Sequence, residues 1–225
     1  MDEHSTIGFP GESAAYRTAR EELLTAERDL RRQVEQVARL RRALPPGGAV
    51  PEDCVFEEGP DAHTVKLSEL FGNGLDTLVL YSFMFGPEMK QACPMCTSFI
   101  DSLNGTAPHA SQRINLAVVA KSPIARIREF GLQRGWHNLR LLSSAGNTYN
   151  RDYHAETSEG GQLPVLSVFV RRDGKVSHFY STELVYAKAD PGQNQRHIDM
   201  MWPLWNLLDM TPEGRGEDWY PRLSY

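Results

Sequence analysis

Residues 77–85 read Thr-Leu-Val-Leu-Tyr-Ser-Phe-Met-Phe, and a Cys-Pro-Met-Cys sequence follows at residues 93–96. The first stretch is uncharged and rich in aliphatic and aromatic side chains, which is typical of a strand buried on both faces. Gly86-Pro87 ends this strand. A helix is predicted to begin at the cysteines and to end near Asn104-Gly105. The two cysteines are therefore expected where a buried strand gives way to a helix.

That junction suits thiol chemistry. The first N–H groups of a helix have no partner within the helix, and the helix dipole places partial positive charge there. Both effects favour a thiolate and lower the pKa of the first cysteine of such a pair. We therefore expect Cys93 to be the attacking thiolate and Cys96, one helical turn later, to resolve a mixed disulfide. Pro94 fits because the first helical turn requires no N–H at that position.

Beyond this junction, strand-like and helix-like stretches alternate. Strand–helix–strand units imply parallel pairing, whereas an Asp173-Gly174 hairpin turn adds an antiparallel pair. The sequence thus predicts an α/β fold with a mixed central sheet flanked by helices. The other expected elements are a hairpin of residues 55–56 with 64–65, a helical turn at 66–71, strands at 114–120, 139–142, 165–170 and 176–180, a helix capped by Ser122 with Pro123 at its first position and ending near Gly135, and a final helix at 197–208 that Pro203 either kinks or starts.

A second feature is the Leu163-Pro164 pair before the third buried strand. A proline at the start of a strand removes a donor from the sheet, which indicates that the position has a purpose. Residues 164–169 and the following Asp-Gly hairpin resemble the cis-proline strand of thioredoxins, in which the proline faces the dithiol. This resemblance implies that Leu163 and Pro164, together with Pro94 and Met95 between the cysteines, contact the substrate.

Three stretches of the chain form a recognisable set. They are Phe83-Met84-Phe85-Gly86-Pro87-Glu88 leading into Cys93-Pro94-Met95-Cys96, His178-Phe179-Tyr180-Ser181-Thr182, and Leu208-Asp209-Met210-Thr211-Pro212-Glu213-Gly214-Arg215. These stretches resemble family 899 of the domains of unknown function, a thioredoxin-like group of predicted dithiol-disulfide oxidoreductases. The likeness covers most of the chain and implies a thioredoxin-like fold and a thiol-redox role. The family itself suggests little about the substrate.

The N-terminal part predicts one long helix from a Ser13 cap to about Leu44, stopped by residues 45–48. Its apolar positions alternate three and four apart, which is the heptad pattern of a coiled coil. We therefore expect an N-terminal arm, residues 1–48, that forms a homodimer, followed by a thioredoxin-like domain at 49–225. The seam positions are Tyr16, Ala19, Leu23, Ala26, Leu30, Val37, Leu40 and Leu44, with Gln33 in the one polar position.

Composition narrows the class of protein. The net charge of −5 does not favour nucleic-acid binding. No stretch approaches the roughly 20 apolar residues of a membrane-spanning helix. Residues 1–5 lack the pattern of a secretory signal, and three cysteines do not make a disulfide scaffold. We therefore expect a cytoplasmic protein without a membrane or nucleic-acid partner.

Three alternatives remain beside the oxidoreductase reading. The first is a peroxiredoxin-like peroxidase, although Lys90 stands where those enzymes place a threonine. The second is a copper or zinc site made by the two cysteines with His109 or His154. The third is a scaffold with idle cysteines.

The oxidoreductase reading carries its own requirements. It needs no organic cofactor, but it does need a thiol or disulfide substrate, either a protein or a small molecule, and a reducing partner. Glu88 and Lys90 flank the dithiol and are candidates for tuning its pKa. Cys54 lies near a predicted strand and is expected to be a passive apolar residue.

Overall fold

The computed structural model describes residues 7–45, 47–188, 190–191, 199–216 and 219–224. The chain divides into two compact units, residues 1–45 and 46–225, which are described separately. Residues 1–5, expected to lack a secretory signal, lie outside the described part, as does the stretch 192–198 that contains the expected start of the last helix.

The first unit contains one helix, α1 (Ala14–Arg42). The Ser13 hydroxyl caps it by accepting a hydrogen bond from the Tyr16 N–H at 3.1 Å, which confirms the expected start. None of the residues of α1 is buried within the chain. Two seam residues, Leu23 and Leu30, are 47% and 61% exposed. The helix is confirmed, and nothing within its own unit covers its apolar seam.

The second unit is built on a seven-stranded sheet with the order β2-β1-β5-β4-β3-β6-β7. Strand β3 pairs in parallel with β4, and β4 pairs in parallel with β5. The remaining pairs are antiparallel, including β3 with β6 and the hairpin of β6 with β7. The sheet is therefore mixed, as predicted. The strands are β1 (Val55–Glu58), β2 (His63–Lys66), β3 (Thr77–Ser82), β4 (Asn115–Ala120), β5 (Arg140–Ser143), β6 (Leu166–Arg172) and β7 (Lys175–Ser181).

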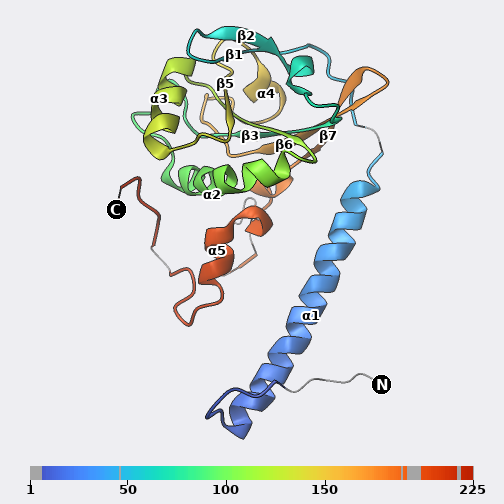
Figure 1. Cartoon of the computed structure of the whole chain (residues 1–225), viewed down its shortest axis with the longest axis vertical. Helices are drawn as coiled ribbons and strands as arrows, with labels where there is room; N and C mark the ends of the chain where they lie inside the picture. Colours follow the sequence, from blue (N-terminus) through green and yellow to red (C-terminus); the bar gives the residue numbers. More distant parts are fainter. Residues whose placement is uncertain (1–6, 46, 189, 192–198, 217–218, 225) are drawn as a thin grey trace. The chain divides into compact units, whose positions relative to one another are not determined.

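Helices cover both faces of this sheet (Figure 1). One face packs against α2 (Pro94–Ala110) and α3 (Ile124–Arg134), while α5 (Pro203–Leu208) packs against α2 on the side away from the sheet. The other packs against two short elements, η1 (Leu67–Leu70) and α4 (Tyr149–Asp152). Two further single turns are η2 (Glu183–Val185) and η3 (Asp199–Met201).

Strand β3 is buried on both faces, as its sequence predicted. Tyr81 enters the core under α2, while Leu78 and Leu80 enter the core under α4, as the alternation of a strand requires. The unit is an α/β domain with a thioredoxin-like fold. Within the described residues, no helix combines the length and the apolar character needed to cross a bilayer.

Helix α2 runs further than predicted, through Gly105 and Pro108 to Ala110. A proline within a helix leaves the carbonyl four residues earlier without its usual donor. Here that carbonyl belongs to Asn104, and the Asn138 side-chain amide donates to it at 3.2 Å. A partner distant in sequence thus satisfies the group that Pro108 leaves open, and the helix continues.

Two expected features of the backbone are wrong. Ser122 does not cap α3, because its hydroxyl donates to the Phe85 carbonyl at 2.7 Å and Pro123 occupies the cap position. The described peptide bonds include no cis bond, so the bond between Leu163 and Pro164 is trans. Trans is the ordinary preference of a bond before proline.

Local turn signals were more reliable. Asp173 and Gly174 have φ angles of 50° and 75° in the β6–β7 turn, and Gly135 ends α3 with a φ of 73°. Helix α5 starts at Pro203, which was one of the two outcomes expected for that residue. These expectations are confirmed.

The core under α2 supports a stability prediction. Ile100 is 0% exposed, so Ile100→Ala should lower the free energy of unfolding by about 2–5 kcal/mol through lost burial and the cavity left behind. Leu132→Ala, at a residue 64% exposed on α3, should change it by less than about 0.5 kcal/mol. Urea unfolding followed by circular dichroism measures both. Equal losses would mean that α2 does not bury this face.

Candidate active site

The two cysteines lie at the N-terminus of α2, just beyond the end of β3. Cys93 is the cap residue, and its N–H donates to the Met84 carbonyl at 3.1 Å, which ties the start of the helix to the loop after β3. Its Sγ accepts a hydrogen bond from the Cys96 N–H at 3.4 Å. Pro94 is the first helical residue, as predicted. The Cys93 sulfur therefore receives one of the N–H groups that a helix start leaves open.

Burial distinguishes the two thiols. Cys93 is partly exposed, whereas Cys96 is 1% exposed and belongs to the core between α2 and the sheet. Met95 between them is partly buried and packs against the same core. The arrangement presents one sulfur toward solvent with the second sulfur behind it.

The same geometry separates the two pKa values. The pKa of Cys93 is lowered to about 6, mainly by a hydrogen bond from the Cys96 side chain, and burial opposes this effect. The Cys96 N–H and the Tyr220 hydroxyl lower it further. Burial, followed by the interaction with Cys93, holds the pKa of Cys96 well above its usual range. At neutral pH the pair shares one proton: Cys93 is a thiolate, and the Cys96 thiol donates to it.

Tyr81 lies behind the second thiol. Its side chain is 0% exposed, and its hydroxyl has no hydrogen-bond partner within the described residues. Burial raises the pKa of Tyr81 well above its usual range, and Cys96 is the next largest influence. In turn, the Tyr81 hydroxyl lowers the pKa of Cys96. A buried proton donor without a fixed partner thus adjoins the inner sulfur.

Tyr220 reaches the outer thiol from the C-terminal end of the chain. Its hydroxyl lies 3.7 Å from the Cys93 Sγ. The neighbouring Trp219 packs edge-on against Trp205 of α5, with ring centroids 5.9 Å apart. On the other side, the Arg134 Nη1 donates to the Leu223 carbonyl at 2.8 Å. Sequence reasoning missed Tyr220, because no local pattern connects it with the cysteines.

The loop between β3 and α2 is held by Arg126 of α3. Its guanidinium donates to the carbonyls of Gly86 and Met89 and lies over the Phe85 ring at 4.1 Å from the centroid. Glu88 and Lys90 are exposed on this loop. The largest influences on the Cys93 pKa are Cys96, burial and Tyr220, and neither of these two residues is among them. Their tuning role stays a prediction.

Leu163 and Pro164 lie at the start of β6. The Ser82 N–H donates to the Val165 carbonyl at 2.8 Å, so this segment runs beside the end of β3. Pro164 is buried and Leu163 is partly buried. No hydrogen bond of the described residues joins either one to the cysteines, so a substrate-binding role for them stays a prediction.

The metal alternative finds no third ligand in the described residues. No group of three or more His, Cys, Asp or Glu side chains there is placed to hold an ion. His109 lies in the last turn of α2, at the end of the helix opposite the cysteines. Cys54 is buried, and burial raises its pKa to about 11, in keeping with the passive role expected for it.

The fold and the site together define a thioredoxin-fold protein with a cysteine pair at a helix N-terminus. The chain belongs to a bacterial protein family of unknown function (DUF899), whose sequence profile matches residues 8–225. No curated protein matches it in sequence.

Solved structures similar to this chain include three peroxiredoxins. Peroxiredoxin Q of Xylella fastidiosa is 14% identical with a TM-score of 0.47, and the match covers 61% of this chain and 84% of that one. Prx3 of Vibrio vulnificus is 13% identical with a TM-score of 0.47, and the match covers 70% of this chain and 96% of that one. The peroxidoxin BcpB of Mycobacterium tuberculosis is 20% identical with a TM-score of 0.43, and the match covers 64% of this chain and 92% of that one. These likenesses assign no substrate to this chain.

The separated pKa values give a direct test. The rate at which iodoacetamide alkylates the Cys93 peptide should reach half its maximum near pH 6, compared with about 8.5 for a free cysteine. Tyr220→Phe removes a hydroxyl that lowers this pKa, so the midpoint should move upward. Tyr16→Phe, on α1, should leave it unchanged. Mass spectrometry of the digested protein measures each rate, and a midpoint near 8.5 in the unaltered protein would contradict the assignment of the thiolate.

Proposed function

We propose that this protein is a thiol-disulfide oxidoreductase that uses the Cys93–Cys96 dithiol. The observation that carries the proposal is the partly exposed Cys93 Sγ, which accepts the Cys96 N–H at the start of α2 while the Cys96 thiol lies buried behind it. A thiolate that is stabilised and reachable is the nucleophile of disulfide exchange. A buried thiol one turn later is suited to reacting second.

The reaction proceeds in two exchanges. The Cys93 thiolate attacks one sulfur of a disulfide; a new S–S bond forms, the old one breaks, and the departing thiolate takes a proton from solvent. The Cys96 thiol then loses its proton and attacks the Cys93 sulfur, which releases the second substrate thiol. The substrate disulfide gains two electrons and two protons, and the protein is left with a Cys93–Cys96 disulfide. A reducing partner must return the two electrons.

Each exchange also involves a proton, and a tyrosine hydroxyl lies beside each of the two sulfurs. The Tyr220 hydroxyl, at 3.7 Å from the Cys93 Sγ, donates toward the thiolate while it waits for substrate. The Tyr81 hydroxyl adjoins Cys96 and is the buried group that can donate a hydrogen bond to the thiolate formed when Cys96 ionises. Formation of the mixed disulfide removes the negative charge of Cys93, which is the third largest contribution to the raised pKa of Cys96, after burial and the hydrogen bond to Cys93. The inner thiol therefore ionises more readily after the first exchange than before it.

Single substitutions test the proposal. The reduced protein should reduce 2-hydroxyethyl disulfide in the presence of dithiothreitol, and Cys93→Ser should abolish turnover. Cys96→Ser should accumulate a mixed disulfide on Cys93, visible by mass spectrometry. Cys54→Ser, at a buried cysteine outside the site, is the matched control and should retain activity.

Three results would change the assignment. Full turnover by Cys93→Ser would refute it. Rapid oxidation of Cys93 by hydrogen peroxide, with no exchange with disulfides, would favour the peroxidase alternative. Reactivity with neither would leave the protein as a scaffold with idle cysteines.

We further propose that α1 pairs with the α1 of a second copy as a coiled coil. The support is the heptad seam itself, whose apolar residues, Leu23 and Leu30 among them, are exposed on a helix that nothing in its own unit covers. A second copy is the partner that carries the same repeat with the same spacing, and coiled coils bury such seams against each other.

Charge placed in the seam should separate the copies. The full chain with Leu23→Glu and Leu30→Glu should elute as a monomer in size-exclusion chromatography with light scattering, because two buried charges oppose pairing. Leu24→Glu is the control: Leu24 is 46% exposed but lies outside the seam, so the dimer should persist. A monomeric unaltered protein, or a double variant that stays dimeric, would contradict pairing through this helix.

A further inference from the structure

A concave site lies on the face of the sheet opposite to the dithiol. It is a pocket of about 610 Å³, formed by four segments that are distant in sequence: residues 48–51, residues 152–154 after α4, Val165, and residues 178–186 of β7 and η2. Tyr153 and His178 of this pocket pack on Phe169, which belongs to the core under α4, whereas both cysteines belong to the core under α2. Its volume is within the usual range for small-molecule sites.

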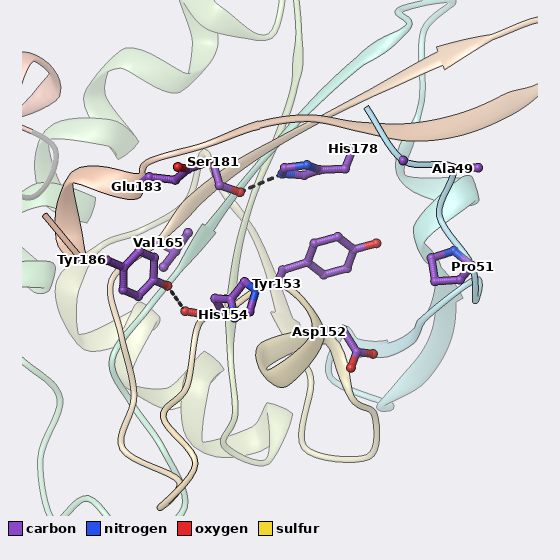
Figure 2. A pocket seen from close by; sticks show the side chains of 11 residues that line it. Ala49, Pro51, Asp152, Tyr153, His154, Val165, His178, Ser181, Glu183 and Tyr186 are labelled. Atoms are coloured by element: carbon purple, nitrogen blue, oxygen red, sulfur yellow. Dashed lines mark hydrogen bonds between the residues drawn. The ribbon is translucent and has the colours of Figure 1, made fainter. Parts of the chain in front are cut away.

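Backbone contacts hold the walls in place. The His178 N–H donates to the Gly48 carbonyl and the Val50 N–H donates to the Val176 carbonyl, each at 3.0 Å, so residues 48–50 lie along β7. At the other end, the Tyr186 hydroxyl donates to the His154 carbonyl and joins η2 to the segment after α4 (Figure 2). The pocket is therefore formed before any ligand arrives.

Most polar side-chain groups that line the pocket already make hydrogen bonds within the protein. The His178 Nε2 shares a hydrogen bond with the Ser181 Oγ at 2.8 Å, and that hydroxyl shares another with the Ser167 Oγ at 2.9 Å. Figure 2 shows the Tyr153 ring extending into the space beneath His178, with ring centroids 5.8 Å apart. The Tyr153 hydroxyl makes no hydrogen bond among the described residues. The pocket thus offers aromatic faces and one free hydroxyl.

The charge of the lining has one sign. Asp152 and Glu183 are its only carboxylates, and no lysine or arginine is among the described residues that line it. Asp152 is paired with Arg151 at 3.2 Å, so Glu183 supplies the uncompensated charge. Glu183 influences two other lining residues electrostatically. It is the largest influence after burial that raises the pKa of Tyr186, and it favours the charged form of His178. Such a rim attracts a cation and repels an anion.

The pocket also accounts for a motif that the dithiol does not use. In His178-Phe179-Tyr180-Ser181-Thr182, the first residue and Ser181 line the pocket. The Thr182 hydroxyl accepts a hydrogen bond from the Leu166 N–H at 2.9 Å and so fixes the strand start next to Val165, another lining residue.

We propose that this pocket binds a small organic cation with an aromatic or apolar body, whose charge faces Glu183 and whose apolar part lies against the rings of Tyr153 and His178. Cations lie favourably over the faces of aromatic rings, and the ligand's apolar body would be removed from water against those rings. This site is independent of the proposed redox function and requires no reaction at the cysteines.

Three probes of one size and three charges test the proposal: benzylamine, benzyl alcohol and benzoate, added to the full chain at neutral pH. Isothermal titration calorimetry should show that benzylamine binds at least about threefold more tightly than benzyl alcohol, and that benzoate binds most weakly. Proton NMR locates the site. Benzylamine should shift the ring signals of His178, identified by their loss in His178→Gln, while those of His109 on α2 stay in place.

Two variants distinguish the contribution of the Glu183 charge to binding from that of the aromatic lining. Glu183→Gln, at an exposed position, should remove the preference for benzylamine over benzyl alcohol and leave the binding of the alcohol unchanged. Tyr153→Leu should weaken both, with circular dichroism confirming that it is folded. Glu57→Gln, an exposed carboxylate of β1 outside the pocket, is the control and should change nothing. Equal binding of all three probes, binding that leaves the His178 signals unmoved, or no binding at millimolar concentration would overturn the proposal.

Discussion

The arrangement of this domain depends on the burial of β3. The strand is paired with β4 on one side and β6 on the other, and its side chains enter a core on each face. A strand enclosed in this way makes polar side chains costly along its length. The buried hydroxyls that lack a hydrogen-bond partner among its described residues, those of Tyr81 and Ser82, lie at its carboxyl end. Polar chemistry is therefore confined to its ends. At its carboxyl end the chain turns into α2, whose open N–H groups meet the Cys93 sulfur.

Local sequence was sufficient where local physics decides the structure. Uncharged β-forming side chains identified β3, an Asp-Gly pair identified the β6–β7 turn, and Ser13 identified the start of α1. The errors have a different origin. Helix α2 passes Pro108 because Asn138 supplies a missing donor, and Ser122 is diverted from its capping role by the Phe85 carbonyl. In both cases a partner far along the chain overrides a local preference.

The same distinction applies to the sites. The two cysteines and the helix that begins at them could be predicted, because motif and junction are contiguous. Tyr220 could not be, since its approach to Cys93 depends on Trp219 meeting Trp205 and on Arg134 binding the Leu223 carbonyl. Nor could the pocket beside His178, which four separate segments form only after the sheet is assembled. Sequence patterns identify which side chains can react, whereas tertiary packing determines which of them meet.

The proton shared by the cysteines also bears on the direction of electron flow in the proposed cycle. The contacts that lower the Cys93 pKa to about 6 act on a thiolate, and a disulfide has no such charge to stabilise. They favour the dithiol form above about pH 6, increasingly until the ordinary cysteine pKa of about 8.5, and the effect disappears below pH 6 as the thiolate is protonated. A thiolate stabilised in this way makes the disulfide form more oxidising. In the proposed cycle, the contacts that stabilise the Cys93 thiolate therefore favour return of the Cys93–Cys96 disulfide to the dithiol by the reducing partner.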